Sequence, residues 1–334
     1  MKTGTRREML RRVIAVPWAG AGVQGKEGVA ESGRGGKAEL RFGVIADVHQ
    51  DVMPDGAARV GAFVRAMEEA GVDFVVQLGD FCVPHERNRG FMEVWNGYKG
   101  RRYGVLGNHD MDGGYTREQA AAFFGMPERR YGFEAGGWRG IVLDGNEPGG
   151  KARGYARYVS EGQLRWLEEQ LAADRRPAFV FIHQPVDGEN EGCVENGAAV
   201  RAVLEKAQRE RPGVVAAVIS GHRHLDYARE VGGVRYLEIN SASYWWLNAP
   251  GAARETFSAE EHRRHPNLKS VAAYRDPLWA VVTVTEGGRE LVVTGRSSEW
   301  VGPDPWERGE TARWPREELH PGIGDRRFVL RGKG

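Results

Sequence analysis

Continuous apolar runs and amphipathic stretches alternate along the chain from residue 40 onward. Phe42–Ala46 and Phe74–Leu78 are short, mostly apolar runs, which are typical of strands buried on both faces of a sheet. Between them, Gly56–Ala70 carries apolar residues at helical spacing, and Gly71 follows as a candidate C-cap. A strand, a helix and a strand in this order predict a βαβ unit with parallel strands and a right-handed crossover.

The same two patterns predict the remaining regular elements. Helical spacing covers Ser160–Ala172 and Val194–Arg209, and Ser160 and Gln163 have the spacing of a capping box. Apolar runs predict further β-structure over Arg102–Leu106, Tyr131–Asp144 (a hairpin turning at Gly136-Gly137), Phe179–Ile182, Val214–Ile219, Val234–Asn240, Trp279–Thr285 and Glu290–Gly295. This alternation of strands and helices predicts an α/β fold.

These elements define one predicted domain over residues 40–296, with loop insertions at 145–158 and 244–274. The first insertion is basic, and it is either a lid that contacts phosphate through Lys151, Arg153 or Arg157, or a solvated loop. Residues 297–334 are rich in Pro, Gly, Arg and Glu without a clear period, which predicts an irregular C-terminal tail. The Gly- and charge-rich residues 24–39 predict a flexible linker.

Residues 1–23 have the composition of an export signal. Thr5–Arg11 (TRREMLR) is basic, and the mildly apolar stretch Val13–Val23 follows it and contains Ala19-Gly20-Ala21. A charged start, a short apolar region and an A-x-A site are the parts of a signal peptide, and paired arginines followed by Met-Leu resemble the twin-arginine type. The sequence therefore favours an exported or periplasmic protein; the alternative is a cytoplasmic protein with a basic start.

Composition narrows the possible partners. The chain has 47 Lys and Arg residues against 46 Asp and Glu residues, a net charge of +1, which argues against binding to polymeric nucleic acid or to a membrane surface. No apolar run approaches the ~18 residues that a spanning helix needs. Cys82 and Cys193 do not form a disulfide framework or a C-x-x-C zinc motif, and the sequence leaves open whether they pair.

Metal-binding residue types follow five of the predicted strands directly: Asp47 and His49, Asp80, Asn108 and His109, His183, and His222 and His224. Five of the nine histidines in the chain lie at these positions. Ligands of open α/β sheets bind beyond the carboxyl ends of the strands, so we expect these side chains to converge. If the strand period of two continues past Ala46, Asp47 and His49 point to the same side.

This many nitrogen and oxygen ligands exceeds the needs of one tetrahedral site. The set suits two adjacent ions that share a carboxylate and lie ~3.5–4 Å apart. Imidazole, carboxylate and amide ligands together favour Fe, Mn, Zn or Co over Ca or Mg, which prefer shells of oxygen alone. The sequence therefore predicts two transition-metal ions as cofactors.

The ordered series D-x-H, G-D, G-N-H-D, a strand-final H and G-H-x-H, from Asp47 to His224, resembles the motif series of the calcineurin-like metallophosphoesterases. Every ligand position of that series is filled. The resemblance implies the metallo-dependent phosphatase fold, a four-layer α/β/β/α sandwich with two central mixed β-sheets. It implies one metal ion held by Asp47, His49, Asp80 and His224, and a second held by Asp80, Asn108, His183 and His222, so that Asp80 bridges the two.

The resemblance also implies that His109 is a catalytic residue rather than a ligand. His109 would lie beside the substrate as general acid or charge stabiliser, and Asp110 would orient it and favour its protonated form. Asn108 and His109 would both contact the substrate. The alternative for His109 is an ordinary loop histidine.

The resulting hypothesis is a dinuclear phosphoesterase that hydrolyses phosphate mono- or diesters, with a hydroxide that bridges the two ions as the nucleophile. A small-molecule or nucleotide substrate is favoured, because no basic tract in the sequence suggests a polymer. Two alternatives stay open: a phosphoprotein phosphatase, which an open groove would favour, and a non-catalytic scaffold with the same fold.

Overall fold

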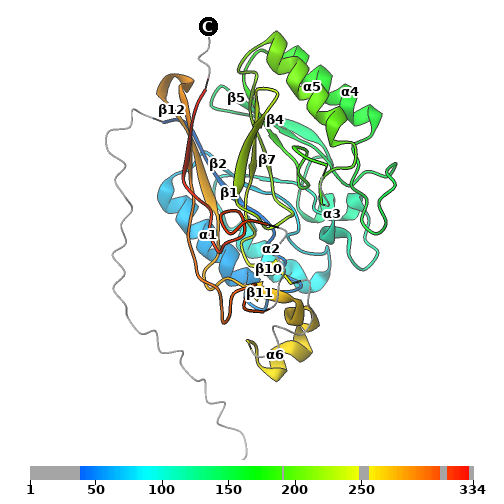
Figure 1. The fold of residues 1–334 in the computed structure, drawn as a ribbon, viewed down its shortest axis with the longest axis vertical. Coiled ribbons are helices and arrows are strands. Elements are labelled where there is room, and N and C mark those ends of the chain that lie inside the picture. The colour runs from blue at the N-terminus through cyan, green and yellow to red at the C-terminus, as the bar shows by residue number, and fades with distance from the viewer. Residues whose placement is uncertain (1–37, 190–191, 248–255, 309–313, 331–334) are drawn as a thin grey trace, which may run out of the picture. The chain divides into compact units, whose positions relative to one another are not determined.

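The computed structural model describes residues 38–189, 192–247, 256–308 and 314–330 (Figure 1). The predicted export signal and residues 24–37 of the predicted linker lie outside the described residues. The end of that predicted linker is corrected: the first strand begins at Ala38, two residues earlier than the predicted domain.

Two six-stranded mixed sheets form the centre of the domain. The first contains, in spatial order, β14 (Arg326–Val329), β13 (Glu290–Thr294), β12 (Ala280–Thr285), β1 (Ala38–Ile45), β2 (Phe74–Gln77) and β3 (Arg101–Gly104). The second contains β4 (Tyr131–Ala135), β5 (Trp138–Val142), β6 (Ala178–Phe181), β7 (Val215–Ser220), β9 (Val234–Glu238) and β8 (Tyr227–Val231).

The central strands of each sheet run parallel. In the first sheet β1, β2 and β3 are parallel, and Phe42 pairs with Phe74. In the second sheet β5, β6, β7 and β9 are parallel, whereas β4 and β8 are antiparallel edge strands. The carboxyl ends of the parallel strands of each sheet therefore lie at one edge of that sheet.

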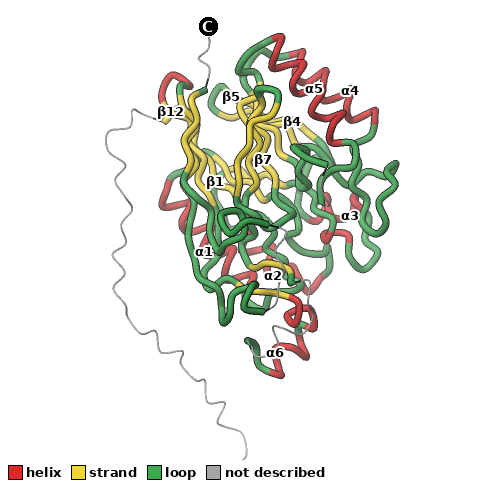
Figure 2. Tube along the Cα trace, in the orientation of Figure 1, coloured by secondary structure: helices red, strands yellow, loops and turns green. Residues whose placement is uncertain are grey.

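The helices cover the outer faces of the two sheets, and Figure 2 shows the strands grouped between them. Helices α1 (Gly56–Ala70) and α2 (Arg89–Asn96) pack together beside the first sheet, and α4 (Glu161–Ala173) and α5 (Gly197–Glu210) pack together on the second (Figure 1). The short helices α3 (Arg117–Phe123) and α6 (Ala259–Arg264) lie in connecting segments. These layers confirm the predicted four-layer α/β/β/α sandwich.

Aromatic side chains join the two sheets in the core. Phe42 of β1 stacks on Phe74 of β2 with 4.7 Å between ring centroids, and it meets the edges of Phe179 and Phe181 of β6 at 5.0 and 5.9 Å. A separate apolar cluster lies between the second sheet and its helices, where Leu167 of α4 is fully buried. Burial of such side chains contributes about 1.5–3 kcal/mol each, so the apolar runs detected in the sequence stabilise both layers.

Local signals at three glycines are confirmed. Gly71 ends α1 in the left-handed conformation, with φ 60°, and its N–H bonds back to the helix. Gly136 and Gly137 have φ values of 55° and 82° in the turn between β4 and β5. These conformations disfavour a Cβ atom, which explains the glycines.

The predicted capping box at α4 is only half correct. The Ser160 hydroxyl accepts a hydrogen bond from the N–H of Gln163, as expected. The Gln163 side chain does not accept from the N–H of Ser160, which donates to Oε2 of Glu147 instead. Gln163 is fully buried, and its amide bonds the backbone N–H and C=O of Asp144 and the same Oε2, so it links the segment that follows β5 to the start of the helix.

The predicted irregular tail contains a strand that the sequence analysis missed. β14 pairs antiparallel with β13 at the edge of the first sheet. Its sequence, RRFV, is short and half charged, and Val329 is 71% exposed, so it shows no apolar run. The insertion at 244–274 likewise holds two short strands that pair with each other, β10 (Tyr244–Trp246) and β11 (Val271–Ala273).

The described residues also show the state of the two cysteines and whether any of their helices could span a membrane. Cys82 and Cys193 are buried thiols, so they do not form a disulfide. No helix in the described part of the chain combines the length and the apolar character that a membrane-spanning segment requires.

Candidate metal centre

The candidate ligands converge, as predicted, just beyond the carboxyl ends of β1, β2, β3, β6 and β7. Six of them are almost completely buried, with exposed fractions of 0–4%: Asp47, His49, Asp80, Asn108, His183 and His224. His222 and His109 are partly exposed. A cluster of carboxylates and imidazoles at this depth requires compensation, either from mutual hydrogen bonds or from bound cations.

The first group of potential ligands is Asp47, His49 and His224, whose ligand atoms all lie within 4.8 Å of one another. The Nε2 atoms of His49 and His224 are 3.2 Å apart, and Nε2 of His224 lies 3.4 Å from Oδ1 of Asp47. The three donors come from two segments that are far apart in the sequence: Asp47 and His49 follow β1, and His224 follows β7.

The second group is Asp80, His183 and His222, with ligand atoms again within 4.8 Å of one another. Nε2 of His183 lies 3.2 Å from Oδ2 of Asp80 and 3.1 Å from Nδ1 of His222. Oδ1 of Asn108 lies 3.2 Å from the same Nε2, so the Asn108 amide belongs to this group.

Asp80 lies between the two groups. Its Oδ2 is 3.2 Å from Nε2 of His183 in one group and 3.7 Å from Nε2 of His49 in the other. A carboxylate in this position can bind two ions at once, which is the arrangement of two-metal sites.

Hydrogen bonds at Nδ1 determine which nitrogen of His183 and of His224 carries the lone pair. Nδ1 of His183 lies 2.7 Å from the carbonyl oxygen of Leu78, and Nδ1 of His224 lies 2.6 Å from that of Tyr244. A carbonyl can only accept, so Nδ1 carries the proton and Nε2 presents a lone pair to the centre. This is how metal-binding histidines are usually held, and the donor set therefore fits two transition-metal ions.

The backbone of the ligands is unusual. Five non-glycine residues among those described have positive φ, and all five are candidate ligands: Asp47 (52°), His49 (51°), Asp80 (51°), His222 (78°) and His224 (56°). The expectation that the strand period continues through Asp47 and His49 is wrong, because β1 ends at Ile45. Left-handed residues of this kind cost of order 1–3 kcal/mol each, and such strain concentrates at functional sites.

Close backbone packing holds Asp80 in this conformation. A Cβ atom at Gly107 would lie 2.1 Å from the backbone N of Asp80 and 2.2 Å from its Oδ1. The N–H of His49 donates to the carbonyl of Asp80, and the N–H of His109 donates to Oδ1 of Asp80. The turns after β1, β2 and β3 therefore form one interlocked unit.

Substitution of Gly107 by alanine is expected to displace Asp80. The clash is with backbone atoms, which rotamer changes cannot relieve, so we expect a loss of about 3 kcal/mol of stability together with loss of bound metal. Urea unfolding and elemental analysis measure the two effects. Gly90→Ala in α2, where nothing lies within 4 Å of the added Cβ, is the matched control. A Gly107→Ala protein with wild-type stability and wild-type metal content would contradict this packing argument.

The predicted contact between Asp110 and His109 is wrong. The carboxylate of Asp110 is fully buried and accepts hydrogen bonds from the backbone N–H groups of Asp80, Phe81, Cys82 and Gly107, at 2.7–3.2 Å. Asp110 thus fixes the two turns that carry the ligands. The side chain that bonds His109 is Asp112, whose Oδ2 lies 2.7 Å from Nδ1 of the imidazole.

Aromatic and acidic groups surround His109. Burial lowers its pKa, but the carboxylates of Asp80 and Asp112 outweigh that effect and raise the pKa above its usual value. The ring of Tyr155 lies 4.8 Å from the imidazole, and the ring of Trp246 lies 6.0 Å from it. The surroundings of His109 therefore favour its protonated form.

A cavity of about 510 Å³ opens beside the ligands. Its walls include His49, Asp80 and His109 together with three residues that were not predicted as site residues: Asp112, Tyr155 and Trp246. Tyr155 is the residue that loop 145–158 contributes to this wall, in place of the predicted Lys151, Arg153 or Arg157. The motif spacing gave no signal for these residues, since they lie outside the motifs: Asp112 after β3, Tyr155 in loop 145–158 and Trp246 at the end of β10.

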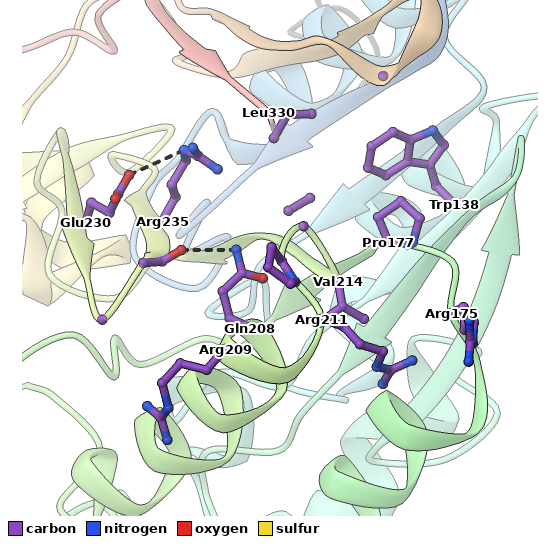
Figure 3. Close-up of a pocket in the computed structure, with 16 residues that line it drawn as sticks. Trp138, Arg175, Pro177, Gln208, Arg209, Arg211, Val214, Glu230, Arg235 and Leu330 are labelled. Carbon is purple, nitrogen blue, oxygen red and sulfur yellow. Dashed lines mark hydrogen bonds and ion pairs between the residues drawn. The ribbon is translucent and has the colours of Figure 1, made fainter. Parts of the chain in front are cut away.

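A second cavity, of about 540 Å³, lies at the other end of the second sheet, beside Pro177 and Val214 at the amino ends of β6 and β7 (Figure 3). Figure 3 shows Arg209 and Arg211 directed away from Trp138 and Leu330 in its wall. Arg211 donates to the carbonyls of Leu171 and Asp174 at the end of α4. The polar groups that line this second cavity do not converge, so we assign no ligand to the cavity.

Comparisons with known proteins agree with this geometry. The sequence model described as calcineurin-like phosphoesterase matches residues 40–226. The chain is 25% identical, over 261 residues, to a 3′,5′-cyclic-nucleotide phosphodiesterase of Nostoc sp. (strain PCC 7120), with 73% of this chain and 91% of the relative covered. It is also 25% identical, over 229 residues, to a probable cyclic nucleotide phosphodiesterase of Synechococcus sp., with 63% and 83% covered.

Solved structures share the fold. A dimetal phosphatase from Danio rerio superposes with a TM-score of 0.56 and 18% identity, over 79% of this chain and 99% of that one. GAP50, described as the anchor in the inner membrane complex of Plasmodium, superposes with a TM-score of 0.54 and 16% identity, over 89% and 90%. One neighbour is described as an enzyme and the other as an anchor, so the site must be argued from its own residues.

Proposed function

Because the chain belongs to the calcineurin-like phosphoesterase family, it is a metal-dependent hydrolase of phosphoric esters, and we propose that its substrates are small phosphodiesters, 3′,5′-cyclic nucleotides among them. The observation that carries the proposal is the pair of buried ligand groups that share Asp80 at the base of a cavity. Two relatives named as cyclic nucleotide phosphodiesterases support the diester.

We assign one ion to Asp47, His49, Asp80 and His224, and a second ion to Asp80, Asn108, His183 and His222. When bound, the two cations supply Lewis acidity, which activates water for attack on phosphorus and offsets the charge of the phosphate oxygens. Fe, Mn, Zn and Co all suit these ligands.

The other side chains of the site position the substrate and move a proton. The amide of Asn108 contacts the phosphate oxygens and stabilises the charge that develops there, and the imidazole of His109 contacts the leaving oxygen. Nδ1 of His109 is bonded to Asp112, so Nε2 is the nitrogen available to protonate the leaving oxygen. Attack by water in line with the leaving group requires no covalent enzyme intermediate.

The shape of the cavity favours a small substrate over a phosphoprotein. Tyr155 and Trp246 stand in its wall beside His109, and a volume of about 510 Å³ is within the usual range for a small-molecule site. All predicted ligands are present, so nothing in the described residues favours the scaffold alternative.

The test is hydrolysis of bis-p-nitrophenyl phosphate, p-nitrophenyl phosphate and a 3′,5′-cyclic nucleotide by the purified protein with Mn, Fe, Zn or Co. We expect turnover of the two diesters that a chelator abolishes and added metal restores, with the diesters cleaved faster than the monoester. Faster cleavage of the monoester would overturn the diester assignment, and no turnover with any ion would overturn the proposed function.

Export through the signal at residues 1–23 stays a prediction.

A further inference from the structure

We propose that Tyr155 is a positioning residue for catalysis: through Asp112, its hydroxyl holds the imidazole of His109 in the orientation that delivers a proton to the leaving oxygen. The inference rests on the proposed function of the site and adds a residue that lies outside the metal-binding motifs. It follows from three side chains that meet at the wall of the cavity.

The three side chains form a closed set of hydrogen bonds. Nδ1 of His109 lies 2.7 Å from Oδ2 of Asp112, and the Tyr155 hydroxyl donates to Oδ1 of Asp112 at 2.7 Å. The hydroxyl oxygen also lies 3.1 Å from Nδ1 of His109. Each oxygen of the Asp112 carboxylate therefore has its own donor.

The geometry also fixes which group donates. An ionised carboxylate can only accept, so both the tyrosine hydroxyl and Nδ1 of His109 donate to Asp112. The remaining lone pair of the hydroxyl oxygen faces the same Nδ1–H. The other N–H proton of His109 is on Nε2, at the opposite side of the ring, and takes no part in the hydrogen bonds to Asp112 and Tyr155.

Asp112 needs such a restraint because its side chain is 43% exposed. An exposed carboxylate with one partner exchanges rotamers and bonds water, and a loss of orientation at His109 would follow. A hydroxyl on the second oxygen removes that freedom. Charge-assisted hydrogen bonds of this kind are shorter and about twice as strong as neutral ones.

The loop that carries Tyr155 is anchored on both sides. The Glu195 carboxylate accepts hydrogen bonds from the backbone N–H groups of Lys151 and Ala152, at 2.6 and 3.0 Å. After Tyr155, the carbonyl of Arg157 accepts from the N–H of Glu195, and the N–H of Tyr158 donates to Gly145. Although the Tyr155 side chain is 44% exposed, its hydroxyl is thus placed by a fixed backbone.

The oxygen of the attacking water forms a bond to phosphorus, and that water releases a proton to solvent. The bond between phosphorus and the leaving oxygen breaks, its electron pair stays on that oxygen, and the oxygen takes the proton from Nε2 of His109. Nδ1 keeps its proton in the bond to Asp112, and Nε2 regains a proton from solvent before the next turnover. The Tyr155 hydroxyl orients this transfer and exchanges no proton with the substrate.

Tyr155→Phe tests the proposal, because it removes the hydroxyl and keeps the ring. A misplaced general acid slows only the release of a poor leaving group, since p-nitrophenolate leaves without protonation. We expect kcat for a cyclic nucleotide to fall about tenfold or more, a part of the 10²–10⁴-fold that a general acid contributes. We expect kcat for bis-p-nitrophenyl phosphate and the metal content to stay within about twofold.

Tyr158→Phe is the matched control. It removes a hydroxyl from the same loop, and that side chain does not line the catalytic cavity. We expect this variant to keep wild-type kcat for both diesters. An equal fall of kcat for both substrates in Tyr155→Phe, or no fall for either, would overturn the positioning role.

A second measurement needs no turnover. In protein with ¹⁵N-labelled histidine, the Nδ1–H proton of His109, assigned by its absence in a His109→Ala sample, should resonate far downfield because it is bonded to a carboxylate. We expect it to move upfield or broaden in Tyr155→Phe and to stay unchanged in Tyr158→Phe. An unchanged resonance in Tyr155→Phe would overturn the inference even if the proposed hydrolase activity failed on every ester.

Discussion

Replacement of Asp80 by asparagine is expected to remove at least one of the two bound ions and to lower phosphodiester hydrolysis by about 10³-fold or more. Oδ2 of Asp80 lies within 3.2 Å of His183 in one ligand group and 3.7 Å of His49 in the other. An amide has a single neutral oxygen ligand, so it cannot offset the charge of two cations. The loss corresponds to several kcal/mol of transition-state stabilisation.

The fold should survive this substitution. Asparagine has the shape of aspartate, and its amide oxygen can still accept the hydrogen bond from the N–H of His109 that Oδ1 accepts now. Elemental analysis, circular dichroism and kcat are measured together. Asp276→Asn, at a position remote from the ligands in the sequence and absent from both groups, is the control for loss of a carboxylate. Two fully bound ions in Asp80→Asn would refute the bridging role.

Replacement of His109 by alanine should leave metal and fold intact and remove most turnover of poor leaving groups. His109 is partly exposed and belongs to neither group of ligands, and its imidazole is bonded to Asp112. Loss of a general acid costs about 10²–10⁴-fold in rate, and the effect shrinks when the leaving group needs no proton. We therefore expect a large fall in kcat for a cyclic nucleotide and a small one for bis-p-nitrophenyl phosphate.

The measurement for this variant is the ratio of the two kcat values, taken with metal content. His265→Ala removes another histidine, on the segment after α6, and serves as the control. Wild-type turnover of the cyclic nucleotide by His109→Ala would show that His109 is an ordinary loop histidine. Loss of metal in the same variant would instead assign it to the ligand shell.

The sequence predicted the architecture and the convergence of the candidate ligands because both depend on local patterns. Mostly apolar runs precede Asp47, Asp80 and His183, and parallel strands bring their carboxyl ends to one edge. The order of the motifs then identified the family. Gly71 and the Gly136-Gly137 turn were predicted for the same reason, since a left-handed backbone favours a specific residue.

The sequence did not predict how the ligands are held. The sequence placed Asp47 and His49 directly after a strand whose period of two could continue, but both have left-handed backbones that the neighbouring turns impose. Hydrogen bonds across distant segments decide such conformations, and they leave no periodicity in the sequence. The interlocked turns around Gly107 likewise depend on contacts between segments that are distant in the sequence.

The same limit explains the errors around His109. Asp110 is adjacent to it in sequence, yet the carboxylate of Asp110 faces four backbone amides, and Asp112 takes the expected contact. Tyr155 comes from a loop in which the basic residues, and not the tyrosine, were the candidate phosphate contacts. A residue placed by a long loop has no spacing rule, so only the fold can bring it to the site.

The central claim is that this chain holds two metal ions that share Asp80. Anomalous diffraction from crystals grown with Mn or Zn, recorded on either side of the metal absorption edge, tests it most directly. We predict two peaks ~3.5–4 Å apart, one beside Asp47, His49 and His224 and one beside His183 and His222, with Asp80 between them. A single peak, or two peaks without Asp80 in contact with both, would contradict the claim.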